Sequence, residues 1–508
     1  MSVDTDNAAF QDALNLIQYT RQSVFLTGKA GTGKSTFLRY VCEHTKKKYV
    51  VLAPTGIAAI NAGGSTMHSF FKLPFYPLLP DDPNLSLQRG RIHEFFKYTK
   101  PHRKLLEQIE LVIIDEISMV RADIIDAIDR ILRVYSHNLR EPFGGKQLLL
   151  VGDVFQLEPV VKNDEREILN RFYPTPYFFS ARVFGQIDLV SIELQKVYRQ
   201  TDPVFVGVLD HIRTNTAGAA DLQLLNTRYG SQIEESEADM YITLATRRDT
   251  VDSINEKKLA ELPGESITFE GVIEGDFPES SLPTSQELVL KPGAQIIFIK
   301  NDFDRRWVNG TIGVIAGIDE EEETIYVITD DGKECDVKRD SWRNIRYRYN
   351  EKTKEIEEEV LGSFTQYPIR LAWAITVHKS QGLTFSRVVI DFTGGVFAGG
   401  QAYVALSRCT SLDGIQLKKP INRADIFVRP EIVNFAGRFN NRQAIDKALK
   451  QAQADVQYAA AARAFNKGDM EECLEQFFRA IHSRYDIEKP VPRRLIRRKP
   501  VSYTHLTL

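Results

Sequence analysis

The sequence predicts an α/β fold in which two lobes with buried parallel sheets each carry an insertion, followed by a helical extension. Short Val, Ile and Leu runs alternate with helix-compatible segments over residues 21–200, which is typical of buried parallel strands. A second block of similar texture begins near residue 201 and resumes at residue 365. From residue 434 onward the composition is helical.

The first lobe is predicted to span residues 1–71 and 105–200. Its apolar runs are SVFLTG, YVVLAPT, LVIIDE and QLLLVGD, each with Gly, Asp or Pro-Thr at its end. Functional groups lie at the carboxyl ends of strands in such sheets, so we expect the site there. Residues 72–104 are rich in Pro, aromatic and basic residues and are predicted to form an inserted subdomain.

The second lobe is predicted to span residues 201–289 and 365–433, with YITLATRR as one strand. Residues 290–364 have a different sequence pattern, in which short segments of alternating polar and apolar residues are separated by Asn-Gly and Asp-Gly turns. Such turns are typical of antiparallel hairpins. This insertion is therefore predicted to form a small antiparallel barrel.

The helical extension covers residues 434–490, and residues 458–481 resemble one tetratricopeptide helix pair. One copy is weak evidence, since a solenoid needs about three repeats. Residues 491–508 are a basic tail that we expect to be disordered. Its last segment, VSYTHLTL, matches nothing before it and is interpreted as a non-native remnant.

The bulk composition indicates a soluble protein of several domains. The chain has 508 residues, 43% hydrophobic and 26% charged, with a net charge of −3, so a polyanion would need a local groove of Lys and Arg. Cys42, Cys335, Cys409 and Cys473 form no CxxC pair, which argues against a zinc site or a disulfide framework. No apolar stretch approaches the roughly 20 residues of a membrane span. We expect a cytoplasmic protein that binds no membrane.

A phosphate-binding loop is predicted at residues 28–35, where GKAGTGKS fits the pattern GxxxxGK[ST] between a strand and a helix. In that context backbone N–H groups surround the β-phosphate, Lys34 reaches the β and γ oxygens, and Ser35 coordinates Mg²⁺. A glycine-rich turn alone fits the pattern too, but the strand before it argues against that reading. Nucleotide contacts are predicted for Gly28, Ala30, Gly31, Thr32, Gly33, Lys34, Ser35 and Thr36.

Two carboxylates end the strand LVIIDE. We expect Asp115 to hold Mg²⁺ and Glu116 to act as general base toward the attacking water. Gln156, in LLLVGDVFQLEPV, is predicted to sense the γ-phosphate or to position that water. ATP is preferred over GTP because the guanine-like NKGD at residues 466–469 lies in the helical tail, and Gln11 is a weak candidate for the base contact.

Two arginines outside the phosphate-binding loop are predicted to supply the positive charge that stabilises the transition state. Arg199 lies in LQKVYRQ near the junction of the blocks, and Arg408 in YVALSRCTS of the second block. Such arginines stabilise charge that develops on a γ-phosphoryl group. Taken alone, each arginine is about equally well explained by a surface salt bridge. The motifs around the two arginines therefore decide between the two interpretations.

That pattern resembles the Pif1 family of superfamily 1B DNA helicases, in its bacterial form, over residues 5–433. GKAGTGKST, APTGIAAINAGGSTMHSFF, VIIDEISMV, GDVFQLEPV, VYRQ, AWAITVHKSQGLTF and YVALSRCTS occur in the family's order. Residues 121–147 resemble the family's signature segment, which separates this chain from RecD-like enzymes. One departure is Glu158, where the family usually has proline.

The resemblance implies two RecA-like lobes, an SH3-like insertion at residues 290–364, and ATP with Mg²⁺ as cofactors. It also implies 5′-to-3′ movement on single-stranded DNA and unwinding of forked duplexes at the bacterial nucleoid, with G-quadruplex DNA as a further candidate substrate. Residues 72–104 are the candidate strand-separating wedge. No protein partner of the helical extension can be named.

The resemblance also assigns DNA contacts. Small side chains and free N–H groups at residues 54–56 suit phosphates, while residues 376–380 add phosphate-binding groups beside a link to the nucleotide at Gln381 and Gly382. Residues 305–307 combine charge with a ring that could stack on a base, although an arginine on a structural tryptophan is nearly as good a reading. The predicted contacts are Pro54, Thr55, Gly56, His68, Phe70, Arg305, Arg306, Trp307, Thr376, His378, Lys379 and Ser380.

Two alternatives stay open at this point. A RecD-like chain would act only as a subunit of a nuclease-helicase assembly. An ATP-gated scaffold would act through the helical extension.

Overall fold

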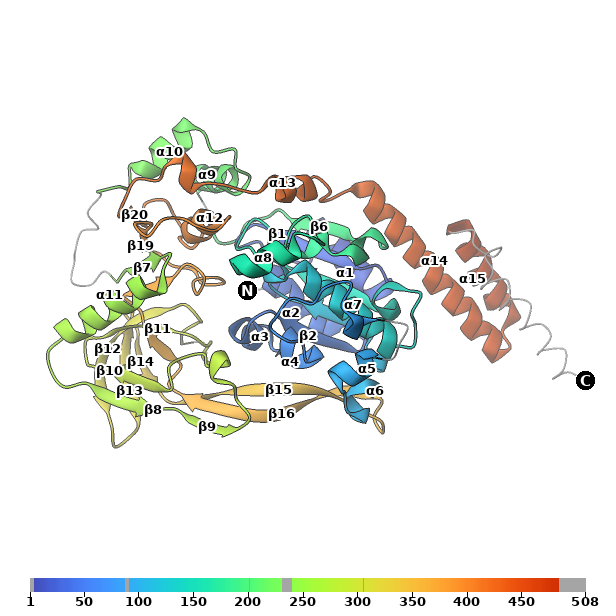
Figure 1. Ribbon diagram of the computed structural model, residues 1–508, viewed down its shortest axis with the longest axis horizontal. Coiled ribbons are helices and arrows are strands. Elements are labelled where there is room, and N and C mark those ends of the chain that lie inside the picture. The colour runs from blue at the N-terminus through green and yellow to red at the C-terminus, as the bar shows by residue number, and fades with distance from the viewer. Residues whose placement is uncertain (1–3, 87–90, 201, 231–239, 305, 484–508) are drawn as a thin grey trace, which may run out of the picture.

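The first lobe is built on one parallel sheet. The computed structural model describes residues 4–86, 91–200, 202–230, 240–304 and 306–483 (Figure 1). Six strands pair in the order β3-β2-β4-β5-β1-β6, and all their pairings are parallel. Their bounds are β1 Val24–Gly28, β2 Tyr49–Ala53, β3 Ser65–Thr66, β4 Leu111–Ile114, β5 Gln147–Val151 and β6 Val190–Leu194. The four predicted strands are confirmed; β3 and β6 were not predicted.

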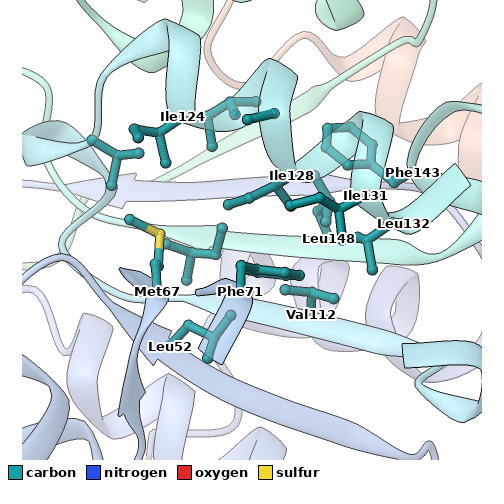
Figure 2. Packing of buried hydrophobic residues seen from close by; sticks show 14 of the residues in the cluster. Leu52, Met67, Phe71, Val112, Ile124, Ile128, Ile131, Leu132, Phe143 and Leu148 are labelled. Atoms are coloured by element: carbon teal, nitrogen blue, oxygen red, sulfur yellow. The ribbon is translucent and has the colours of Figure 1, made fainter. Parts of the chain in front are cut away.

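Helices cover both faces of this sheet. On one face α1 (Ala8–Tyr19) and α2 (Lys34–His44) pack on side chains of β1, β4 and β5. On the other face α4 (Met67–Phe71) and α7 (Ala122–Tyr135) enclose Leu52, Val112 and Leu148. Figure 2 shows this packing, in which the apolar side of α7 lies over the strands. Burial on both sides explains why these strands read as continuous apolar runs.

The second lobe has a smaller parallel sheet of four strands, in the order β18-β7-β19-β20. It carries the second α/β block that the sequence predicts, and the α/β fold class is confirmed. Its elements are α9 Pro203–Arg213, α10 Ala219–Asn226, β7 Ile242–Ala245, α11 Arg248–Glu261, β18 Ala374–Thr376, β19 Val388–Asp391, α12 Gln401–Leu406 and β20 Ile415–Leu417.

Antiparallel strands fill the insertion in the second lobe. They form sheets of the orders β14-β13-β12-β11-β17, β15-β16-β9 and β10-β8. The pairings extend beyond residues 290–364, because β8, β9 and β10 come before that range and β17 after it. The sequence did not predict strands such as β9 (VIEG), because a short charged segment lacks the alternating apolar pattern that indicates a strand. The bounds are β8 Ile267–Glu270, β9 Val272–Gly275, β10 Glu287–Leu290, β11 Gln295–Phe298, β12 Ile312–Asp319, β13 Thr324–Thr329, β14 Glu334–Val337, β15 Asp340–Asn350, β16 Glu355–Gln366 and β17 Ile369–Leu371.

The hairpin of β15 and β16 reaches from the insertion to the first lobe (Figure 1). Alternate residues of β15, namely Ile345, Tyr347 and Tyr349, are buried in the first lobe's hydrophobic core. The hydroxyl of Tyr347 accepts a hydrogen bond of 3.3 Å from the N–H of Val51. The two halves of the molecule are thus joined at a second place, away from the chain crossing between the lobes.

The remaining helices lie at the edges of this frame. In the subdomain between β3 and β4, α5 (Arg91–Phe96) and α6 (Lys100–Gln108) follow a short 3₁₀ turn. At the other end, α13 (Pro430–Ala436) leads into α14 (Arg442–Lys467) and α15 (Met470–Ser483), which project from the body (Figure 1). The start of α14 packs on α1 through Ile445 and Ala448. The predicted basic tail, 491–508, lies outside the described residues. In the part of the chain that is described, we find no helix with the length and apolarity of a membrane span.

Candidate active site

The phosphate-binding loop follows β1 and leads directly into α2. Gly31 and Gly33 have φ values of 80° and 89°, a region that only glycine adopts easily. A Cβ on Gly31 would lie 2.4 Å from the Cβ of Arg199, so this glycine is also needed for close approach. The ammonium of Lys34 donates to the carbonyl oxygens of Gly28 (2.7 Å) and Lys29 (3.0 Å), which folds the loop around it.

A cavity of about 530 Å³ opens above this loop. Both lobes and the junction between them supply its walls. The predicted site residues that line it are Ala30, Gly31, Thr32, Gly33, Lys34, Ser35, Thr36, Glu116, Gln156, Arg199, Gly382 and Arg408. Asp4, Asn7, Phe10, Leu194, Tyr198 and Thr384 complete the lining.

Two acidic side chains lie at the end of β4, as the sequence predicts. Burial, and next the charge of Asp115, raises the pKa of Glu116 to about 7. Burial likewise raises the pKa of Asp115 and lowers that of Lys34, whose charge faces Asp153 and Glu116. Asp115 and Glu116 are half-buried, and two partly desolvated carboxylates side by side are costly unless a cation compensates them. Their oxygens, with the hydroxyl of Ser35 in the cavity wall, are the donors that Mg²⁺ prefers.

The two predicted arginines meet at the same cavity. Arg408 is 2% exposed, and its guanidinium donates to the carbonyl oxygens of Val404 and Ser380. Burial, and next the charge of Arg199, lowers the pKa of Arg408 to about 9. Arg199 donates to the carbonyl oxygen of Ser407 at 3.2 Å. Two cations held this close together suit an anionic ligand between them.

Four predicted nucleotide residues do not line the cavity. Gln11 donates instead to the carbonyl oxygen of Thr5. Gly28 offers its carbonyl to Lys34, while Asp115 and Gln381 are not among the residues that line the cavity. These positions depend on how neighbouring segments fold back, which a local motif does not encode.

Sequence reasoning missed several residues that surround the site. The hydroxyl of Tyr403, on α12, accepts a 3.0 Å hydrogen bond from the N–H of Ala30, so this predicted nucleotide donor is committed to the second lobe. Asp153, two residues after the end of β5, forms a buried ion pair with Arg213 of α9. The Gly-Asp pair before Gln156 was a usable signal for Asp153. Nothing in the local sequence marks Tyr403 as the partner of Ala30 or Arg213 as the partner of Asp153.

On the predicted DNA face, some residues are available to a ligand. Thr55 caps α3 (Gly56–Ala62) with its side-chain oxygen and is exposed, beside Pro54. Lys379 is exposed as well, and His378 is half-buried. His68 stacks on the exposed ring of Phe75, with 5.0 Å between centroids.

Further positions around this face have partners of their own. Gly56 lies so close to Ser281 that a Cβ would come within 2.4 Å of its hydroxyl oxygen. The hydroxyl of Thr376 accepts a hydrogen bond from the N–H of Lys379. Arg305 lies outside the described residues.

Three of the predicted DNA contacts, Phe70, Trp307 and Ser380, are buried in this structure. Phe70 is 3% exposed, because the β15 hairpin covers it, with Tyr347 6.1 Å away between centroids. Trp307 is 6% exposed and stacks on Phe298 at 4.4 Å, so no ring face is offered to a base. The hydroxyl of Ser380 is buried and donates to the carbonyl oxygen of Val377. Arg306 lies over the Trp307 ring and forms ion pairs with Asp302 and Asp336. This arrangement corresponds to the alternative interpretation, an arginine on a structural tryptophan.

Comparisons with known proteins identify the family. The model of the PIF1-like helicase family matches residues 4–207. An ATP-dependent DNA helicase Pif1 of Bdellovibrio bacteriovorus is 31% identical over 439 residues, covering 84% of this chain and 90% of that protein. The chain belongs to the Pif1 family of ATP-dependent DNA helicases. The resemblance, the helicase activity and the enzyme class predicted from the sequence are therefore confirmed.

Solved structures of Pif1 agree in fold. Bacteroides Pif1 in complex with ADP-AlF4 is 42% identical, with a TM-score of 0.77, over 85% of this chain and 96% of that one. Bacteroides Pif1 bound to single-stranded DNA is 41% identical, with a TM-score of 0.62, over 87% and 99%. This Pif1-family chain thus shares the two-lobed α/β fold of an ATP-using, DNA-binding enzyme.

Proposed function

We propose that this helicase moves 5′-to-3′ along single-stranded DNA and that opening and closing of the cavity between its lobes drives each step. The cavity carries the proposal, because the P-loop and Arg408 belong to different lobes and face one space. A triphosphate held between them favours closure, and its hydrolysis weakens that attraction. Chemistry at the γ-phosphate is thereby converted into movement of one lobe against the other.

Within the cavity we assign one role to each group. Lys34 binds the β and γ oxygens, while Ser35 and Asp115 hold Mg²⁺. A bound magnesium ion supplies Lewis-acid stabilisation of the charge on the phosphates. Glu116, whose pKa is raised to about 7 by burial and by Asp115, suits a general base that takes a proton from water near neutral pH. Gln156 orients that water.

Arg199 and Arg408 stabilise the negative charge that develops during phosphoryl transfer. Both line the cavity, and burial lowers the pKa of each. In a site from which water is excluded, such preorganised cations act strongly on a developing charge. Because Arg408 comes from the second lobe, catalysis requires the closed arrangement.

DNA is gripped alternately by the two lobes. Pro54 and Thr55 on the first lobe, and His378 and Lys379 on the second, contact the phosphates of the single strand. The Bacteroides relative bound to single-stranded DNA supports this partner. At a fork on the bacterial nucleoid, the exposed rings of Phe75 and Tyr76 would separate the strands, and structured DNA such as a G-quadruplex is a further substrate.

Strand displacement tests this proposal. Duplexes with a 5′ or a 3′ single-stranded overhang are incubated with the purified chain and ATP, and Lys34→Ala serves as the control without turnover. We expect unwinding of the 5′-overhang substrate only, and none with the variant. Preference for the 3′ overhang would overturn the polarity, and unwinding by Lys34→Ala would overturn the role of the cavity.

A further inference from the structure

Helix α9 joins the second lobe to two parts of the nucleotide site at once. Asp210 and Arg213 are three residues apart, so they lie on the same face of the helix. Asp210 forms an ion pair with Lys29 of the phosphate-binding loop. Arg213 reaches Asp153 at the end of β5. Other residues of α9, with Phe205 and Leu209 among them, are buried in the second lobe's core.

The contact of Arg213 is the stronger of the two. Its side chain is 4% exposed and that of Asp153 is 0%, with two hydrogen bonds of 3.1 and 3.2 Å between them. The guanidinium also forms an ion pair with Glu193 at 2.8 Å, and it lies 4.4 Å from the ring centroid of Phe155. Arg213 lies outside the cavity lining, so it acts through its partners.

Asp153 is the first residue of the turn that carries Gln156. Its side chain accepts from the N–H of Phe155, and its carbonyl from the N–H of Gln156. Gly400 presses on this turn from the second lobe, since a Cβ there would lie 2.2 Å from the carbonyl oxygen of Gln156. The position of Gln156 in the cavity is therefore set by the second lobe.

Tyr403 makes a parallel connection to the phosphate-binding loop. Its ring is 3% exposed, and its hydroxyl accepts from the N–H of Ala30. The same helix, α12, leads to Arg408, which donates to the carbonyl oxygen of Ser380. Ser380 lies in the loop that also carries His378 and Lys379. A continuous set of contacts thus runs from the phosphate-binding loop to the predicted DNA-contacting loop.

We propose that Arg213 and Tyr403 are positioning residues that hold Gln156 and the phosphate-binding loop in a fixed position relative to the second lobe. In this way they couple ATP turnover to the binding of DNA. This inference rests on the proposed function, because it assigns to these residues the link between the cavity and the loop 376–382. Neither residue lines the nucleotide cavity.

The experiment measures steady-state ATP turnover with and without poly-dT, for wild type, Tyr403→Phe and Arg213→Lys. The ratio of the two turnover numbers is the readout, because a purely structural defect lowers both and leaves the ratio unchanged. We expect the ratio to fall about fivefold in Tyr403→Phe, which loses one hydrogen bond, and about tenfold in Arg213→Lys, which loses a bidentate contact. Tyr403→Phe removes only the hydroxyl and keeps the packing of the ring, so this variant still tests the inference if Arg213→Lys folds poorly.

Matched controls come from elsewhere in the chain. Tyr367→Phe removes a buried hydroxyl that donates to Glu323 in the insertion, and Arg133→Lys alters a buried pair with Asp129 inside the first lobe. A wild-type ratio in Tyr403→Phe, or an equal fall in the controls, would overturn the inference alone. If wild type shows no stimulation by DNA, the proposed coupling fails and the inference with it.

Discussion

The nucleotide cavity and the predicted DNA face differ in how their residues are held. In the cavity, the key groups are backbone N–H groups and strand-end side chains, fixed by β1, β4 and β5 of one sheet. On the DNA face, the candidate side chains come from helix α4, from loops and from the insertion, and two of the aromatic ones, Phe70 and Trp307, are buried. A site built on strand ends can be recognised from its motifs. A site that depends on exposure cannot, since distant segments decide what is covered.

The largest effect is expected at the cavity. Lys34→Ala removes the ammonium that the loop surrounds, so ATP turnover should fall to background while affinity for a dT oligomer stays near that of wild type. Turnover is followed by phosphate release and affinity by fluorescence anisotropy. Lys46→Ala, at an exposed lysine beyond the end of α2, should change neither. Loss of DNA binding in Lys34→Ala would instead indicate that the loop supports the fold of both regions.

A slightly smaller effect is expected from the second lobe's cation. Arg408→Lys keeps a charge but loses the planar fork that donates to Val404 and Ser380. We expect kcat for ATP to fall by about 10³-fold, with KM changed by less than about threefold, because the loss is confined to the transition state. Rapid-quench measurements separate the two constants. A rise in KM with kcat intact would mean that Arg408 only binds the ground state.

On the predicted DNA face, Trp307 should act through stability. Its ring stacks on Phe298 within the insertion's core, so Trp307→Ala should lower the free energy of unfolding by about 3 to 5 kcal/mol. Denaturant titration measures this. The matched variant Phe303→Ala, at a ring that is 98% exposed, should leave the unfolding free energy unchanged. An unaltered unfolding curve for Trp307→Ala, with weaker DNA binding, would restore the original prediction.

The smallest effect is expected at an exposed phosphate contact. Lys379→Ala should weaken binding of a dT oligomer about fivefold and reduce the dependence of log K on log salt by about one. Lys257→Ala, at an exposed lysine of the same lobe, is the control and should do neither. An unchanged salt dependence in Lys379→Ala would remove this residue from the DNA face.

The sequence was sufficient for the frame of the fold and most of the cavity, for physical reasons. Buried parallel strands are continuous apolar runs, and a phosphate-binding loop needs glycines at fixed positions, so both leave local patterns. No local sequence pattern predicts that the β15 hairpin packs against the first lobe, because Tyr347 contacts Val51 across nearly three hundred residues of chain. The same applies to Arg213 with Asp153 and to Tyr403 with Ala30, whose contacts form only when the lobes meet.

A nucleotide in the cavity and a single strand on the DNA face should each change the affinity of the other, and reciprocal binding measurements test this coupling. The dissociation constant of a dT oligomer is measured with and without a non-hydrolysable ATP analogue, and that of the analogue with and without the oligomer. We expect both constants to change by the same factor, at least about fivefold, because coupling between two sites is reciprocal. Equal affinities in the presence and absence of the second ligand would show that the two sites are not coupled.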